Sequence, residues 1–298
     1  MRVVAILATF NEERFIAPCL ENLFRQGIEA YLIDNGSTDN TVAIAGSYLG
    51  KGLVAIEKFP NDGTFRWSSL LKRKEELANS IEADWFMHVD ADEIFPSPRP
   101  GITLADVFGE VERQGFNAVN FIQFTFIPTI ETPDHEHAQF IETMRWYYPF
   151  VPAFPHLIRA WKRPSSRIEL ARSGGHQISF PSLHLYPESL PMRHYHFLSV
   201  PHAIRKYVLR HYDRAELENG WHDWRATLKP DLIKLPSQAE LKTYISDDQL
   251  DASNPRTHHC FLDATIGEVD PGLQSSRLMR IANSLGWKYL TRFHKSGH

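Results

Sequence analysis

Two aspartates one residue apart, Asp90 and Asp92, follow the apolar run Trp85-Phe86-Met87 and precede a third acid, Glu93. If that run continues as a β-strand, the two aspartates project to the same side at its end. Two carboxylates in one site repel each other unless a cation or a proton lies between them. Mg²⁺ sites typically combine one or two carboxylates with the phosphates of a substrate. The spacing therefore indicates a site for a metal-bound diphosphate, and an acidic turn after the strand is the alternative.

Alternating strand and helix patterns through the first hundred residues must position these acids. Apolar runs typical of strands lie at residues 2–8, 30–33, 53–56 and 84–89. Because apolar residues recur at helical spacing between them, we expect βαβ units and a mainly parallel sheet flanked by helices, an α/β fold. Ligands of such sheets bind beyond the carboxyl ends of the strands. Three polar clusters are expected at those ends: residues 9–12, 34–39 and 90–93.

The second half of the chain has a less regular pattern. Residues 117–126 indicate a further strand, and a helix is expected from Pro201 to about residues 219–220. The remainder is expected to be an α-rich extension. The predicted organisation is therefore a core at 1–125, an acceptor-side region of the same domain at 126–220, and a C-terminal extension at 221–298.

Composition limits the class of protein. A formal charge of −4 argues against a nucleic-acid partner, and two cysteines cannot form a disulfide framework. No apolar stretch of about 18 residues occurs, so no transmembrane helix is expected. The opening apolar run is too short for a signal peptide, which favours a cytoplasmic protein. The 15 histidines are concentrated after residue 87, which suggests that this part of the chain carries polar or metal-binding functions.

Three sequence blocks together resemble the family 2 glycosyltransferases of the GT-A fold: residues 4–12, 33–41 and 88–93. Their order and separation match that family over roughly residues 1–125. The resemblance implies a GT-A-like sheet and an enzyme that moves a sugar from a nucleotide-diphosphate donor to a hydroxyl acceptor. It further implies a UDP-sugar as the expected donor, Mg²⁺ or Mn²⁺ as the cofactor, and inversion at the anomeric carbon.

Residue by residue, the resemblance assigns donor contacts and metal ligands. The residues expected to contact the donor are Thr9, Phe10, Glu12, Asp34, Asn35, Asp90 and Arg66, with Arg73 as the alternative to Arg66. The residues expected at the metal are Asp92, Asp90 and a late histidine, His194 or His196. Asn35 departs from the acid more common in the family, and because an amide both donates and accepts, the identity of the base stays open.

An inverting transfer also needs a general base near the acceptor hydroxyl. The family commonly uses an acid downstream of the Asp-x-Asp, but no clear acid-rich motif follows it here. We predict the base among Asp134, Glu136 and His176, with Glu131, Glu169 and His135 as further candidates. Gly174 and Gly175 precede His176 and permit close approach of the backbone to a ligand.

Two other functions remain possible at this point. A metal-dependent nucleotidyltransferase also joins an α/β sheet to an acid pair, but it usually has a glycine-rich basic loop where this chain has residues 9–12. A dehydrogenase is disfavoured because no Gly-x-Gly-x-x-Gly follows the first strand. The missing base motif also allows a non-catalytic nucleotide-sugar-binding relative, since a fold alone does not give activity.

Overall fold

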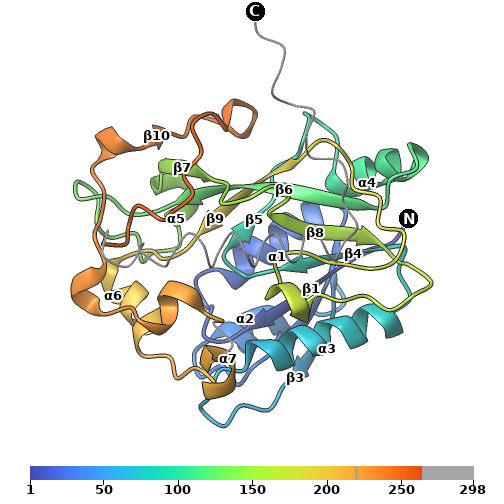
Figure 1. Ribbon diagram of the computed structural model, residues 1–298, viewed down its shortest axis with the longest axis horizontal. Helices are drawn as coiled ribbons and strands as arrows, with labels where there is room; N and C mark the ends of the chain where they lie inside the picture. The colour runs from blue at the N-terminus through green and yellow to red at the C-terminus, as the bar shows by residue number, and fades with distance from the viewer. Residues whose placement is uncertain (219–220, 264–298) are drawn as a thin grey trace, which may run out of the picture.

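A ten-stranded mixed sheet runs through the residues that the computed structural model describes, 1–218 and 221–263 (Figure 1). The strand order is β10-β7-β6-β8-β4-β1-β2-β3, and β9 pairs with β5 and β6. The strands are β1 Val3–Thr9, β2 Glu29–Asp34, β3 Leu53–Lys58, β4 Trp85–Val89, β5 Glu93–Ile94, β6 Ala118–Phe126, β7 Trp146–Phe150, β8 Leu157–Lys162, β9 Leu190–Tyr195 and β10 Lys242–Thr243.

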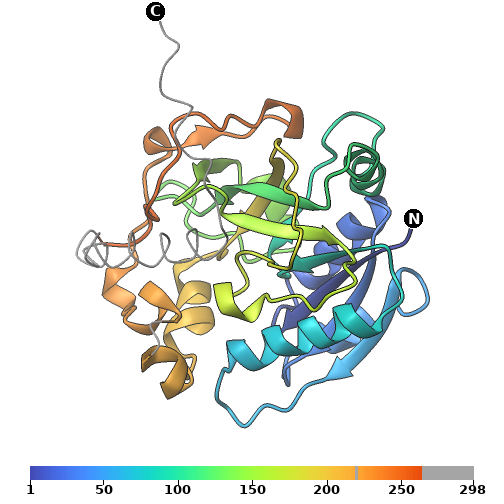
Figure 2. The same ribbon diagram turned by 45° about the vertical axis from the view of Figure 1, so that its right-hand side comes forward.

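Helices cover both faces of the N-terminal part of this sheet. The α-helices are α1 Ile16–Arg25, α2 Thr41–Gly46, α3 Trp67–Ser80, α4 Leu104–Arg113, α5 Phe140–Thr143, α6 Val200–Ala203 and α7 Arg214–Glu218. Figures 1 and 2 show α3 lying along one face, while α1 and α2 lie on the other. The segment from α6 to α7, in yellow and orange, lies to one side of the sheet.

The direction of the strands agrees with the predicted fold class. β1 pairs in parallel with β2 and β4, and β2 pairs in parallel with β3. Because β8 is antiparallel to both β4 and β6, strand β6 runs in the same direction as β4. The sheet is therefore mixed but mostly parallel in direction, as the resemblance to a GT-A core implies.

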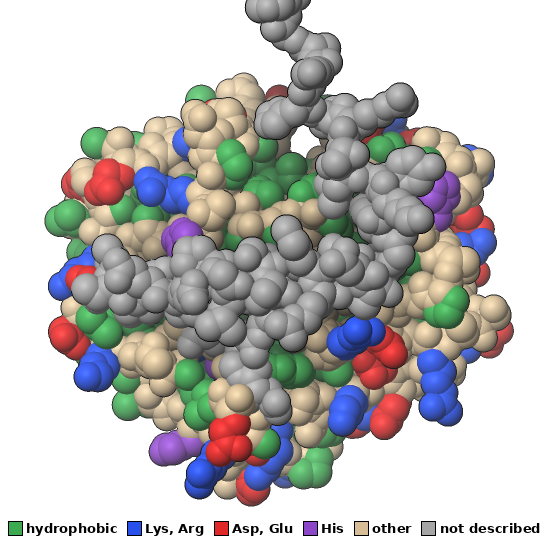
Figure 3. All heavy atoms as spheres, in the orientation of Figure 1, with side chains coloured by type: hydrophobic (Ala, Val, Ile, Leu, Met, Phe, Trp, Pro, Cys, Tyr) green, Lys and Arg blue, Asp and Glu red, His purple; other side chains and the backbone are tan. Residues whose placement is uncertain are grey.

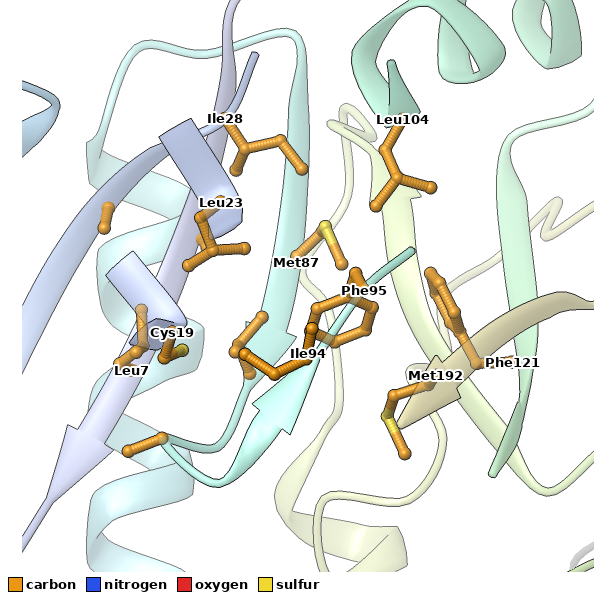
Figure 4. Close-up of a cluster of buried hydrophobic side chains, with 14 of the residues drawn as sticks. Leu7, Cys19, Leu23, Ile28, Met87, Ile94, Phe95, Leu104, Phe121 and Met192 are labelled. Carbon is orange, nitrogen blue, oxygen red and sulfur yellow. The ribbon is translucent and has the colours of Figure 1, made fainter. Parts of the chain in front are cut away.

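The alternation of side chains along the strands divides the core into two layers. Val3, Ala5 and Leu7 of β1 pack in the layer that contains α1 and α4, whereas Val4 and Ile6 face α3 on the other side. Figure 4 shows the first layer, with side chains from β1, α1, β4 and the segment 94–95 pointing toward one another. Cys19 lies fully buried in it, as expected for a small apolar side chain.

The predicted helix from Pro201 to about residue 220 is wrong over part of its length. The α-helical turn of α6 continues as a π-helix, Ile204–Val208, and regular helix resumes only at Arg214. Between them the backbone of His211 and Asp213 bonds to that of Phe65. These bonds to the loop before α3 replace the bonds that would continue the helix.

The predicted α-rich extension is also not found in its described part. Residues 221–263 contain short 3₁₀ helices and strand β10 but no α-helix. Prolines at positions 230, 236 and 255 limit the length of helices in this segment, because proline lacks the amide donor. The rest of the extension, 264–298, lies outside the described residues.

Charge and hydropathy at the surface are ordinary. On the face shown in Figure 3, positive and negative side chains are interspersed around the periphery. Among the described residues, no helix is both long enough and apolar enough to cross a membrane.

Glu216 ties α7 to the start of α3 and provides a test of this fold. Its buried carboxylate accepts hydrogen bonds from the amides of Trp67 (3.1 Å) and Ser68 (2.6 Å) and lies 2.7 Å from His222 Nε2. We expect Glu216→Ala to lower the free energy of unfolding by about 1–3 kcal/mol, because two amides at the helix start lose their acceptor. Urea unfolding near neutral pH measures this loss.

The pH dependence and a matched variant complete the test. Burial raises the pKa of Glu216, but bonds from His222 and Ser68 outweigh it and leave the pKa below its ordinary value of 4.5. The stabilisation should therefore be present above about pH 4.5 and disappear as the pH falls through the folded-state pKa. Glu218→Ala removes an exposed ion pair with Arg214 on the same helix and should cost less than about 1 kcal/mol. Equal losses for both variants would contradict the capping role.

Candidate active site

The ends of β1 and β2 are joined by hydrogen bonds between their polar clusters. The amide of Asn35 donates to the carbonyl of Thr9 (2.8 Å), and the amide of Glu12 donates to Thr41 Oγ1 (2.8 Å). Asn11 adopts a left-handed conformation (φ 57°), and its side-chain oxygen accepts from the amide of Thr38 at 2.7 Å. The clusters at residues 9–12 and 34–39 therefore lie together at one edge of the sheet, as the topology predicts.

Asp34 shapes the turn after β2. Its carboxylate accepts from the backbone amides of Gly36 (3.2 Å) and Ser37 (3.1 Å), and Gly36 has a φ of 78° that favours glycine. Asn35 is buried, and its amide nitrogen donates to the carbonyl of Pro60 at 3.3 Å. Contacts of either residue with a nucleoside stay a prediction.

Asp90 and Asp92 lie in a tight turn after β4 rather than on the strand itself. The strand ends at Val89, and the amide of Glu93 donates to the carbonyl of Asp90 at 3.1 Å. The Glu93 carboxylate accepts from the amide of Asp90 at 3.0 Å. The prediction that Asp90 and Asp92 alternate as in a strand is wrong, because both residues lie in the turn and the turn sets the direction of their side chains. Both carboxylates nevertheless reach one charged cluster.

Two buried cations neutralise this cluster. Arg159 of β8 lies 3.0 Å from Asp90 Oδ2 and 3.1 Å from Glu93 Oε1. Lys206 lies 2.8 Å from Asp92 Oδ2 and 3.3 Å from Glu12 Oε1.

These pairs set the protonation of the acids. Burial opposes ionisation of Asp90, but Arg159 and Lys74 outweigh it and lower its pKa to about 2. For Asp92 burial is likewise outweighed, by Lys206 and His194, and its pKa lies well below the usual range. Burial raises the pKa of Glu12 to about 7, even beside Lys206. Asp90 and Asp92 are therefore ionised at neutral pH and already paired.

The predicted metal ligands come together, but they do not form a metal centre. His194 Nε2 lies 3.3 Å from Asp92 Oδ2, and the His194 and His196 rings stack at 3.9 Å. However, Lys206 occupies the same Asp92 oxygen and Arg159 occupies Asp90. Within the described ranges, no group of three or more His, Cys, Asp or Glu side chains is arranged to hold a metal ion. The residues therefore do not fit the predicted Mg²⁺ or Mn²⁺.

A pocket of about 180 Å³ adjoins the polar clusters that follow β1 and β2. Its lining residues are Phe10, Asn35, Asn61, Gly63, Phe65, Leu209, Arg210 and His211. The Arg210 guanidinium lies 4.4 Å from the centre of the Phe65 ring and 5.9 Å from that of Phe10. No described carboxylate forms an ion pair with Arg210, so its charge is available to an anionic ligand.

Arg66 has a different environment from the one predicted. It lies 2.7 Å from Asp62 Oδ1 and 3.3 Å from Asp213 Oδ2, with a side chain 41% exposed. Arg73, the alternative, pairs with Glu57 and Glu76. Since both guanidinium charges are already neutralised, Arg210 is the better placed cation for a donor.

The three predicted base candidates lie in different surroundings. Asp134 is exposed and accepts from the amide of Glu136 at 2.9 Å. Glu136 is occupied by Ser199 Oγ and by the guanidinium of Arg205. The His176 ring is exposed and lies 5.2 Å from that of His156. Desolvation by the surrounding protein, together with the positive charge of Arg159, lowers the pKa of His176 to about 4. The negative charge of Asp90 acts in the opposite direction.

Of the two glycines before His176, Gly175 closely approaches protein, whereas a Cβ on Gly174 would meet nothing within 4 Å. A Cβ on Gly175 would lie 3.0 Å from His88 Nε2 and 3.1 Å from Leu71 Cδ2, and Gly175 has a φ of 89°. The Trp67 indole donates to the carbonyl of Gly174 at 2.8 Å. These contacts fix the loop against α3 and β4.

Sequence reasoning missed Arg159, Lys206 and Arg210 as site residues. Arg159 and Lys206 come from segments far along the chain from the aspartates that they face, and Arg210 lies near the end of the segment that holds Lys206. Their only signal was the basic character of the segment that contains Lys206 and Arg210, and that character is common on solvated helices.

Residues 4–105 match the family model described as Glycosyl transferase family 2. One relative is the lipopolysaccharide core biosynthesis glycosyltransferase LpsC of Rhizobium meliloti (strain 1021). It is 30% identical over 89 residues, which are 30% of this chain and 31% of the relative.

Two further similarities are more distant in sequence. An uncharacterised protein of Methanocaldococcus jannaschii is 25% identical over 91 residues, which are 30% of this chain and 40% of that protein. The chain therefore spans less than half the length of these two curated relatives. The crystal structure of S. aureus TarS 1–349 in complex with UDP-GlcNAc has a TM-score of 0.39 and 13% identity, covering 65% of this chain and 58% of that one.

Proposed function

We propose that this protein transfers a glycosyl group from a nucleotide-diphosphate sugar to an acceptor hydroxyl, with inversion at the anomeric carbon. The observation that carries this proposal is the pocket containing Phe10, Asn35 and Arg210, at the sheet edge where the Asp90–Glu93 turn also lies. The match of residues 4–105 to the model of glycosyl transferase family 2 supports the same function.

The pocket offers matching chemistry for each part of a donor. The Phe10 ring lines the pocket and offers a face on which a base can stack. The Asn61 amide already bonds to Asn35 and Gly63 and the Asn35 nitrogen to Pro60, so the Asn35 side-chain oxygen is the acceptor offered to a base. We propose a UDP-sugar as the donor, as the resemblance to family 2 implies. Arg210 supplies a cation for the diphosphate.

The reaction then needs one proton acceptor. The acceptor oxygen forms a bond to the anomeric carbon while the bond from that carbon to the diphosphate oxygen breaks and leaves its electron pair on the diphosphate. A neutral ring nitrogen of His176 receives the hydroxyl proton. Its pKa of about 4 keeps it neutral near pH 7. No step is assigned to Mg²⁺ or Mn²⁺, because Asp90 and Asp92 already have cationic partners.

A panel of nucleotides and nucleotide sugars tests this function. We expect UDP and a UDP-sugar to bind by calorimetry, with slow release of UDP from the sugar. Arg210→Ala should weaken UDP binding by about tenfold or more and change uridine binding little, because only UDP carries phosphates. Arg66→Ala is the matched control, since Arg66 is already paired, and it should bind UDP like the wild type.

Two other experimental outcomes would argue against glycosyl transfer by this protein. Binding of UDP-sugars without hydrolysis, and without transfer to any hydroxyl acceptor tried, favours a non-catalytic relative. Equal affinity for nucleotide sugars and for free sugars would overturn the proposal.

A further inference from the structure

Lys206 is a buried cation enclosed by acids from two other parts of the chain. Its side chain is 9% exposed, while those of Asp92 and Glu12 are 8% and 12% exposed. Nζ lies 2.8 Å from Asp92 Oδ2 and 3.3 Å from Glu12 Oε1. The Phe15 ring closes another side, with its centre 4.8 Å from Nζ. Residues from β4–β5, β1–α1 and the π-helix after α6 therefore meet at one ammonium group.

Such a burial is stable only because the charge is paired. Removing an ammonium group from water costs several kcal/mol unless nearby acids compensate. Burial favours the neutral amine, but Asp92 and Glu12 outweigh it and raise the pKa of Lys206 above its ordinary value. The lysine is therefore charged throughout the physiological range.

Two carboxylates bond to the Lys206 ammonium in the described part of the chain. An ammonium group has three N–H donors, and the described residues accept from it through two carboxylates, those of Asp92 and Glu12. The remaining donor is free for an oxygen of a bound anion. The positive charge of Lys206 beside Asp92 also favours the ionised form of that carboxyl group.

We propose that Lys206 is the resident cation of the Asp90–Asp92 turn and binds the donor diphosphate in the place that the sequence assigns to a divalent metal. This inference rests on the proposed function for the identity of the anion. Asp92 and Glu12 hold the ammonium, and Arg159 performs the corresponding neutralisation at Asp90.

The proposal gives the leaving group its electrostatic partner. When the bond between the anomeric carbon and the diphosphate oxygen breaks, the electron pair and the negative charge remain on the diphosphate. A fixed ammonium group stabilises that charge without reorganisation during the step. Arg210 lies along the same segment, four residues after Lys206, and supplies a second positive charge.

Two measurements on the full chain test the inference. UDP binding is followed by calorimetry in EDTA and in Mn²⁺, and Mn²⁺ binding alone is followed by electron paramagnetic resonance without nucleotide. We expect the wild type to bind UDP with affinities that agree within about twofold in the two conditions. It should show no Mn²⁺ site of its own, because the carboxylates are already paired.

Variants of Lys206 make the test specific. Lys206→Ala should weaken UDP binding in EDTA by about tenfold or more, and Mn²⁺ should restore part of that loss. Lys206→Arg keeps the charge and should keep most of the affinity, which separates lost charge from lost folding. Lys162→Ala removes a lysine paired with Glu112 elsewhere on the sheet and should change neither measurement.

Opposite results overturn the inference. They are a wild type that binds Mn²⁺ without nucleotide, or one whose UDP affinity falls about tenfold in EDTA and returns with Mn²⁺. A protein that binds no nucleotide in either condition refutes the proposed function instead. In that case, Mn²⁺ binding that appears only in Lys206→Ala still supports Lys206 as the resident cation, and its absence there counts against it.

Discussion

Asp92→Asn should lower the rate of glycosyl transfer by roughly 10²–10³-fold, the typical cost of losing one preorganised electrostatic group in an active site. Asparagine keeps the shape of the side chain but removes the charge that holds Lys206 at 2.8 Å. The ammonium then has only Glu12 as an anionic partner, and burial raises the pKa of that acid to about 7. The measurement is the initial rate of nucleotide release at saturating donor and acceptor.

A second aspartate provides the control for this prediction. Asp106 caps α4 through its bonds with Thr103, far from the cation cluster in sequence. Asp106→Asn should cost about 1 kcal/mol of stability and leave the transfer rate unchanged. If Asp92→Asn transfers sugar at the wild-type rate while remaining folded by circular dichroism, the assigned role of the acid turn is wrong.

His176→Ala should lower kcat by roughly 10²–10⁴-fold, the usual contribution of a positioned general base. Of the three predicted bases, His176 is the one whose pKa responds to both Arg159 and Asp90. Glu136 is already bonded to Ser199 and Arg205, and Asp134 is exposed. The measurement is kcat for transfer, with donor affinity checked separately by calorimetry.

The pH profile distinguishes a base from a structural residue. A neutral imidazole accepts a proton and an imidazolium does not, so kcat/KM should be level near neutral pH and fall as the pH drops through about 4. His184→Ala is the control, because His184 bonds to the carbonyl of Gly115 near the start of β6, at the opposite edge of the sheet. A greater loss from Glu136→Ala than from His176→Ala would assign the base to the acid.

Local patterns were enough to predict the sheet edge that carries the acids. The apolar runs that predict strands at residues 2–8 and 84–89 correspond to β1 and β4 within one residue at each end. Parallel strands joined by helices place their carboxyl ends at one edge. The meeting of residues 9–12 with 34–39 follows directly, and hydrogen bonds between Asn35 and Thr9 confirm it.

Details that depend on packing were not predictable in this way. The segment after α6 has a helical pattern, but its backbone at residues 211–213 bonds to Phe65 and breaks the helix. The turn at Asp90 likewise depends on Glu93 folding back onto its amide. In both places a bond to a neighbouring segment or side chain replaces the regular bonding that periodicity predicts.

The sequence by itself determined the mostly parallel sheet and the edge at which the acids gather, because these depend on short-range periodicity and chain topology. Only the tertiary structure decided which cations face those acids. Arg159 and Lys206 lie 69 and 114 residues from their aspartate partners, and no local pattern links such positions. The reason is electrostatic: a buried carboxylate needs a counter-charge, but the chain can supply it from any segment that packing brings within reach.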